Sequence, residues 1–160
     1  EICACLVGSE MCIRDRCEGE QYTQRIRDFL NDIDECMIPR LSQRVNIKEY
    51  SHKLARNAHT LFADFGGEDI GACSIYCNRE NAFISSIAVK KNYTNCGVAT
   101  ELLKRSIELA RHYACKKVAL NVCYTNQAAL NLYKKNNFVE IASLGIWKTM
   151  ELNIIYPEMK

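Results

Sequence analysis

The chain has 160 residues, the size of one ordinary domain, and 48% of them are hydrophobic, which is enough to bury a core. No apolar run approaches the ~20 residues that a membrane-spanning helix needs, so we expect no membrane partner. The formal net charge is +2, from 21 basic and 19 acidic residues, and this balance argues against nucleic acid as a partner.

The first 17 residues differ from the rest, because EICACLVGSEMCIRDRC follows neither a helical nor a strand period. Its string VGSEMCIRDR resembles translated sequencing-adapter read-through. We therefore expect residues 1–17 to be a non-native or disordered segment and residues 18–156 to form a single domain. A metal site on the four thiolates of this segment is an alternative, but their spacing matches no established zinc pattern, and we expect no metal. These thiolates belong to Cys3, Cys5, Cys12 and Cys17.

The other six cysteines are scattered along the chain without a C-x-x-C pair. In a core-forming chain of this size, such cysteines are typical of buried free thiols in a reducing compartment, so we expect a cytoplasmic protein. A disulfide framework is the alternative, although such frameworks are typical of smaller secreted chains.

Two amphipathic helices are predicted first. From Gln21 onward, apolar residues recur at steps of three and four until Pro39 ends the helix. Asn46 followed by Glu49 resembles a capping box, and it begins a second helix whose apolar stripe runs to Ala58.

Three short strands follow, at residues 60–65, 70–77 and 82–89. Gly66-Gly67 and the polar residues 78–81 are the turns between them. Consecutive strands with short turns predict an antiparallel meander.

The second half alternates helices and strands. A long helix is predicted at residues 99–113, a strand at 117–123, and a helix from the N-cap Asn126 to about Asn136. Two strands, 138–142 and 146–152, close the chain before a frayed tail. Because a strand–helix–strand crossover makes its two strands parallel, we predict an α/β (α+β) fold with a mixed, mostly antiparallel central sheet.

The turn before the long helix, NYTNCGVATELL (92–103), has the composition of an anion site. The first N–H groups of a helix lack intrahelical partners and lie at the positive end of its dipole. Small residues such as Gly97 and Ala99 let an anion approach this backbone, so residues 95–100 are a candidate pyrophosphate site. Glycine also begins helices for packing reasons alone.

A second stretch, NQAALNLYKKNNF (126–138), makes the pattern specific. Together with TNCGVA (94–99), it resembles the two motifs of the GCN5-related N-acetyltransferases (GNAT), Arg/Gln-x-x-Gly-x-Gly/Ala and Asn-x-x-Ala-x-x-x-Tyr-x-x-x-Gly-Phe. Thr94 stands where the family has Arg or Gln. Asn137 stands where it has Gly, and Asn tolerates the left-handed conformation. The resemblance implies the GNAT-like acyl-CoA N-acyltransferase fold, with helices on both faces of the sheet.

The resemblance also implies a function: direct transfer of an acetyl group from acetyl-CoA to a primary amine. Tyr133 is the acid expected to protonate the departing thiolate, and its alternative role is that of a core tyrosine. A backbone N–H of residues 87–89 is the expected donor to the oxygen that gains charge. The residues expected to bind acetyl-CoA are Ile87, Ala88, Val89, Thr94, Asn95, Cys96, Gly97, Val98, Ala99, Thr100 and Asn126.

The acceptor and the general base stay open. The family often has a Glu where this chain reads Ser85-Ser86, so no base is assigned. Residues 37–46 and 143–146 are expected to line the site of a small-molecule or peptide amine, in a monomer or homodimer. The alternative function is a non-catalytic acyl-CoA-binding sensor or regulatory module of the same fold.

Overall fold

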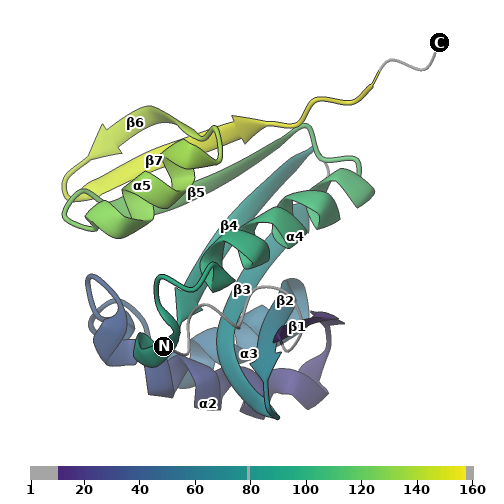
Figure 1. The fold of residues 1–160 in the computed structure, drawn as a ribbon, viewed down its shortest axis with the longest axis vertical. Coiled ribbons are helices and arrows are strands. Elements are labelled where there is room, and N and C mark those ends of the chain that lie inside the picture. Colours follow the sequence, from purple (N-terminus) through teal and green to yellow (C-terminus); the bar gives the residue numbers. More distant parts are fainter. Residues whose placement is uncertain (1–10, 79, 158–160) are drawn as a thin grey trace.

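The computed structural model describes residues 11–78 and 80–157. A seven-stranded sheet of order β1-β2-β3-β4-β5-β7-β6 runs through this part of the chain (Figure 1). All neighbouring strands are antiparallel except β4 and β5, which are parallel, so the predicted mixed sheet is confirmed. The strands are β1 (Met11–Cys17), β2 (His59–Phe65), β3 (Glu68–Asn78), β4 (Asn81–Val89), β5 (Lys117–Cys123), β6 (Val139–Leu144) and β7 (Trp147–Asn153).

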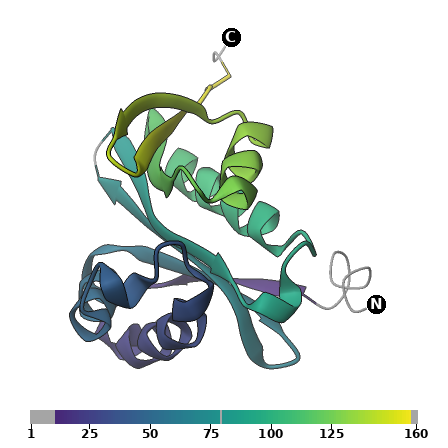
Figure 2. The ribbon, with the colours of Figure 1, turned by 90° about the vertical axis from the view of Figure 1, so that its left-hand side faces the viewer.

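Helices cover both faces of the sheet, as predicted. Figure 2 shows one pair of helices on one side of the strands and the other pair on the opposite side. Each side has its own buried apolar cluster, one centred on Phe62 beneath α2 and α3 and one on Leu102 beneath α4. The helices are α2 (Thr23–Ile33), α3 (Ile47–Asn57), α4 (Val98–His112) and α5 (Gln127–Lys135).

The first helix ends earlier than Pro39, so that prediction is wrong. After α2 the chain forms a short 3₁₀ turn, η3 (Asp34–Cys36). The carboxylate of Asp34 accepts hydrogen bonds from the backbone N–H of Ser42 at 2.7 Å and from its hydroxyl at 2.7 Å. These bonds join residues eight positions apart and hold the chain in a folded loop. The apolar period in the sequence continues to Met37 and gives no sign of this loop.

The two predicted N-caps are confirmed. Asn46 Oδ1 accepts from the N–H of Glu49 at 3.1 Å, at the start of α3. Asn126 Oδ1 accepts from the N–H of Ala129 at 3.2 Å, at the start of α5. Each bond satisfies a helix-end N–H that has no intrahelical acceptor, which is why these local signals could be read from the sequence.

Strand β1 was not predicted. It pairs with β2 at the edge of the sheet, with Met11 opposite Phe65 and Ile13 opposite Ala63. Met11 and Ile13 pack against the buried cluster beneath α4. Main-chain pairing and this packing place the strand, and neither requires a recognisable polar–apolar period in its sequence. Residues 1–10, with Cys3 and Cys5 of the alternative metal site, lie outside the described residues.

A β-bulge in β4 opens the centre of the sheet. Ser74 pairs with Ser86 and Ile75 with Ile84, so Ser85 is an extra residue without an opposite partner on β3. A bulge bends its strand and re-aims side chains. The parallel pairing with β5 reaches only to Ile84 opposite Leu120. Beyond that point the last residues of β4 separate from β5, and the opening between the strands faces the start of α4.

Gly71 lets α4 pack closely on β3. A Cβ at Gly71 would lie 3.0 Å from side-chain atoms of both Val98 and Leu102, two buried residues of α4. The absence of a side chain at Gly71 therefore fixes how near the first turn of α4 comes to the opening in the sheet.

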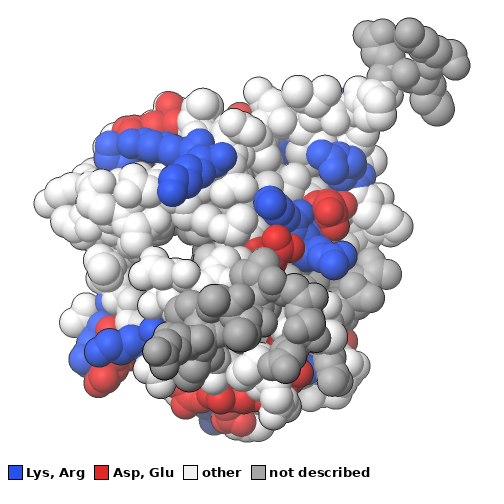
Figure 3. Space-filling model, viewed as in Figure 1, with Lys and Arg blue, Asp and Glu red and all other residues white. Residues whose placement is uncertain are grey.

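None of the helices in the described residues is long and apolar enough to cross a membrane. On the face seen in Figure 3, basic and acidic side chains are interspersed and neither sign covers it.

Candidate active site

The predicted phosphate loop has the backbone geometry of an anion site. Gly97 is the N-cap of α4 with φ of 80°, a left-handed conformation that favours glycine. Asn95 is also left-handed, with φ of 60°. The first intrahelical bond runs from the N–H of Glu101 to the carbonyl of Gly97. The N–H groups of residues 98–100 precede it, at the positive end of a 15-residue helix.

A cavity, here called the α4 cavity, begins at this loop and continues into the opening between β4 and β5. It brings together ten of the eleven residues predicted to bind acetyl-CoA. They are Ile87, Ala88, Val89, Thr94, Asn95, Gly97, Val98, Ala99, Thr100 and Asn126. An elongated ligand with an anionic end and an amide-containing arm fits this lining, since charged groups meet helix N–H groups and the arm meets the exposed edge of β4.

The hydroxyl of Thr94 is less available to a phosphate than its position in the motif predicts. Its hydroxyl donates to the carbonyl of Lys91 at 2.9 Å and so closes the short turn η5 (Lys91–Tyr93). This bond occupies the hydroxyl proton that would otherwise be offered to a phosphate oxygen. The backbone N–H groups of residues 98–100 are therefore the donors that the loop offers to an anion.

Cys96 is the one predicted cofactor residue that does not line the α4 cavity. It is buried, and it is disulfide-bonded, so the prediction of a free thiol is wrong for this residue. The other cysteines in the described part of the chain are not in disulfides: Cys12, Cys17, Cys36, Cys73, Cys77, Cys115 and Cys123.

Tyr133 lies where two cavities meet. Its side chain is 5% exposed and packs against Phe138, with ring centroids 5.8 Å apart. It also lines the α4 cavity and a second one, here called the Trp147 cavity. Burial raises the pKa of its phenol, so the proton stays on the oxygen at neutral pH. Tyr133 is thus a buried residue whose protonated phenol lines both cavities.

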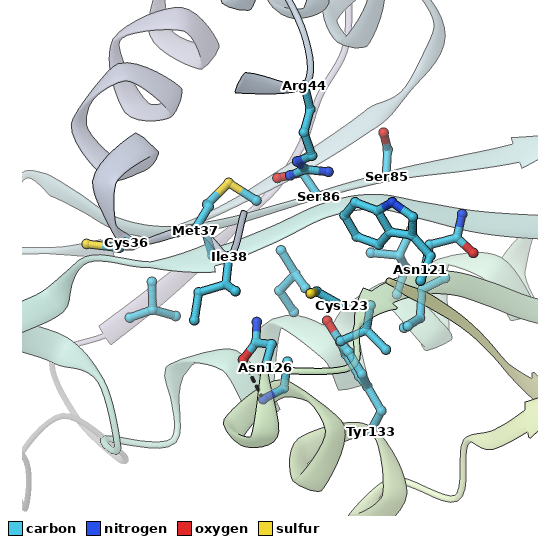
Figure 4. A pocket seen from close by; sticks show the side chains of 18 residues that line it. Cys36, Met37, Ile38, Arg44, Ser85, Ser86, Asn121, Cys123, Asn126 and Tyr133 are labelled. Carbon is cyan, nitrogen blue, oxygen red and sulfur yellow. Dashed lines mark hydrogen bonds between the residues drawn. The ribbon is translucent and has the colours of Figure 1, made fainter. Parts of the chain in front are cut away.

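The Trp147 cavity lies on the other side of this junction (Figure 4). Met37, Ile38 and Arg44 line it from the predicted segment 37–46. The predicted turn 143–146 does not line it, and the side chain that does is Trp147, the first residue of β7. Residues 143–146, at the end of β6 and in the turn after it, are exposed, whereas Trp147 faces the cavity.

Sequence reasoning also missed two contacts in this region. The guanidinium of Arg44 lies over the Trp147 ring, 5.1 Å from its centroid. The hydroxyls of Tyr50 and Ser85 are hydrogen-bonded at 2.5 Å. The four residues are separated by up to 103 positions in the sequence, and no local pattern links them.

Neither cavity offers a side-chain base of ordinary strength. Among the described residues that line them there is no Asp, Glu or His. Tyr50 lies in an adjoining groove, and burial raises the pKa of its phenol to about 12 despite its hydrogen bond with Ser85. A phenol with such a pKa stays protonated near neutrality and cannot accept a proton from an ammonium group.

Comparison with known proteins identifies the fold. The chain resembles the GNAT-family acetyltransferase of Streptococcus pneumoniae with a TM-score of 0.74 at 24% identity, covering 91% of this chain and 99% of that one. It resembles the PaiA N-acetyltransferase of Thermoplasma acidophilum, determined with coenzyme A, with a TM-score of 0.71 at 14% identity over 89% and 99% of the two chains.

Sequence relatives share the activity name. An N-alpha-acetyltransferase of Sulfurisphaera tokodaii is 30% identical over 145 residues, which cover 79% of this chain and 86% of the relative. A Bacillus subtilis protein, provisionally named a ribosomal protein bS18-alanine N-acetyltransferase, is 31% identical over 88 residues, or 54% of this chain and 58% of that one. The sequence pattern of the Acetyltransferase (GNAT) family matches residues 23–138. The chain therefore belongs to the GNAT family of N-acetyltransferases.

Proposed function

We propose that this protein transfers the acetyl group of acetyl-CoA directly to the α-amino group of a polypeptide. The observation that carries the proposal is the junction of the two cavities. The α4 cavity and the Trp147 cavity share one wall, formed by Ile87, Ala88, Val89, Asn126, Ala129 and Tyr133. Donor and acceptor entering from opposite sides would meet there, which is the geometry that direct transfer requires.

The roles follow from the groups present at the junction. A backbone N–H of residues 87–89, on the strand edge left open beyond Ile84, donates to the oxygen that gains negative charge. The amine nitrogen forms a bond to the acetyl carbon as the carbon–sulfur bond breaks. Tyr133 gives its proton to the departing thiolate, and the surplus proton of the amine passes to water. Tyr133 is then reprotonated from solvent.

Asn126 would hold the arm of the donor. Its Oδ1 is engaged in capping α5, which leaves the amide NH₂ group (Figure 4) to donate into the junction. Capping and ligand binding use different atoms of one side chain, so the two roles are compatible.

The missing base favours an acceptor that loses its proton easily. An α-amino group has a pKa of about 8 and a lysine side chain about 10.4, so at pH 7 the free-base fraction is roughly two-hundredfold larger for the α-amine. The N-alpha-acetyltransferase names of the relatives support the same choice.

The pH profile tests this reasoning. We expect kcat/KM to rise with pH and level off above the pKa of the acceptor amine itself, about 8 for a peptide α-amine. No fall is expected up to pH ~10, because burial raises the phenol pKa of Tyr133 and keeps the acid protonated. The midpoint should move upward when the acceptor is a lysine side chain. A midpoint common to both acceptors would mean that an enzyme group is titrating, and it would contradict the proposal.

The function itself is tested with two matched peptides, one with a free α-amine and acetylated lysine, the other with a blocked α-amine and free lysine. Thiol release from acetyl-CoA should occur with the first and be slower by at least tenfold with the second. Direct transfer predicts intersecting double-reciprocal plots, whereas an acetyl-enzyme would give parallel ones. Acetyl-CoA binding without turnover on either peptide would instead favour the non-catalytic sensor.

A further inference from the structure

Arg44 is the one charged side chain among the described residues that line the Trp147 cavity and the groove beside it. It follows the short turn η4 (Leu41–Gln43). In Figure 4 its guanidinium points toward the cavity from the side opposite Tyr133 and Asn126. An acceptor with its amine at Tyr133 would therefore extend toward Arg44.

The charge of Arg44 has no carboxylate partner among the described residues. The nearby Arg40 pairs with Glu35 at 3.3 Å, and Arg25 pairs with Asp69 at 2.6 Å. Arg44 instead stacks on Trp147, a cation–π contact that orients the guanidinium without neutralising it. Its hydrogen-bond donors are left for a ligand.

A second donor lines the same cavity. Asn121 lines both the Trp147 cavity and the groove, and its Oδ1 accepts from the hydroxyl of Thr149 at 2.8 Å. Its NH₂ group therefore remains to donate. A guanidinium and an amide NH₂ in one lining, with no acidic side chain among the described lining residues, are a donor set that a carboxylate fits.

We propose that the acceptor carries a carboxylate close to its reacting α-amine, and that Arg44 recognises it. This inference rests on the proposed function and adds the substrate class: an acidic N-terminal segment, with Asp or Glu directly after the first residue. A polyamine or a peptide with an early lysine would place a second cation beside Arg44 with no acid to offset it, and is disfavoured.

The test measures kcat/KM at pH ~9, where the α-amine of every peptide is mostly free. Three peptides differ only at the second residue, which is Glu, Gln or Lys, and free glutamate and spermidine are added as small acceptors. We expect kcat/KM for the Glu peptide to exceed that for the Gln peptide by about fivefold, which corresponds to the upper end for an exposed ion pair. The value for the Lys peptide should be lower than that for the Gln peptide. The preference should shrink at high salt.

Three variants separate recognition from structural effects. Arg44→Gln should bring the Glu/Gln ratio to about one, and Arg44→Glu should reverse the order of the Glu and Lys peptides. Arg40→Gln, a change in the same loop but outside both cavities, should keep the wild-type ratio. The thermal shift given by acetyl-CoA should be unchanged in all three, since none lines the α4 cavity.

The outcomes distinguish the two proposals. Equal acetylation of the Glu and Gln peptides by the wild type, or a Glu preference that survives Arg44→Gln, overturns the carboxylate inference and leaves the proposed function intact. If free glutamate is a better acceptor than the Glu peptide, Arg44 still recognises a carboxylate. The carboxylate then belongs to a small molecule, and the proposal of a peptide acceptor is overturned. No turnover on any amine, with acetyl-CoA still bound, overturns both.

Discussion

Tyr133→Phe should lower kcat by about a hundredfold or more, the usual scale for a positioned acid, and leave folding nearly unchanged. The ring remains in its place, since it is 5% exposed and packed on Phe138, so the substitution removes only the hydroxyl. The loss should appear in kcat more than in KM, because proton donation to the thiolate is made only in the transition state. Single-turnover measurements of acetyl transfer provide the check.

A matched control is available in the turn before α5. Tyr124 is 51% exposed and lines neither cavity, so Tyr124→Phe should retain full turnover. If Tyr133→Phe also turns over at the wild-type rate where chemistry is rate-limiting, Tyr133 is a core residue only and water supplies the proton.

Gly97→Val should abolish the stabilisation that acetyl-CoA gives to the folded protein. Wild type is expected to gain about 2.7 kcal/mol at a ligand concentration of 100 Kd. At Gly97, φ is 80°, and a branched side chain would both strain the turn and obstruct approach to the N–H groups of residues 98–100. Thermal unfolding with and without acetyl-CoA measures the difference.

Gly67→Val separates strain from lost binding. Gly67 has φ of 83° in the β2–β3 turn, and a Cβ there would meet no atom within 4 Å. Both variants should lose a similar ~1–2 kcal/mol of stability from the left-handed conformation. Only Gly97→Val should also lose the acetyl-CoA shift. If acetyl-CoA stabilises Gly97→Val as much as it stabilises the wild type, the assignment of the phosphate loop is wrong.

Several features of this protein were predictable because they depend on neighbouring residues. Asn46 and Asn126 cap helices three residues from their bonding partners. Asn137 stands where the family has Gly and adopts φ of 67°, as its tolerance for the left-handed region predicted. The strand, glycine turn and helix of residues 82–113 place the loop and its N–H groups by local geometry alone.

The surroundings of the Trp147 cavity were not predictable in the same way. Arg44 lies on Trp147, and Tyr50 bonds to Ser85, only because the sheet order puts β7 beside β5 and the bulge at Ser85 opens β4. The early end of α2 depends on Asp34 bonding to Ser42, and β1 depends on pairing with β2. The sequence by itself determined the fold class, the helix caps and the glycine turn that begins α4, since period and turn chemistry act within a few residues. The tertiary structure alone decided the lining of the Trp147 cavity, with Arg44 as its one charged side chain among the described residues, because strand register and crossover connections bring together side chains that are far apart in the chain.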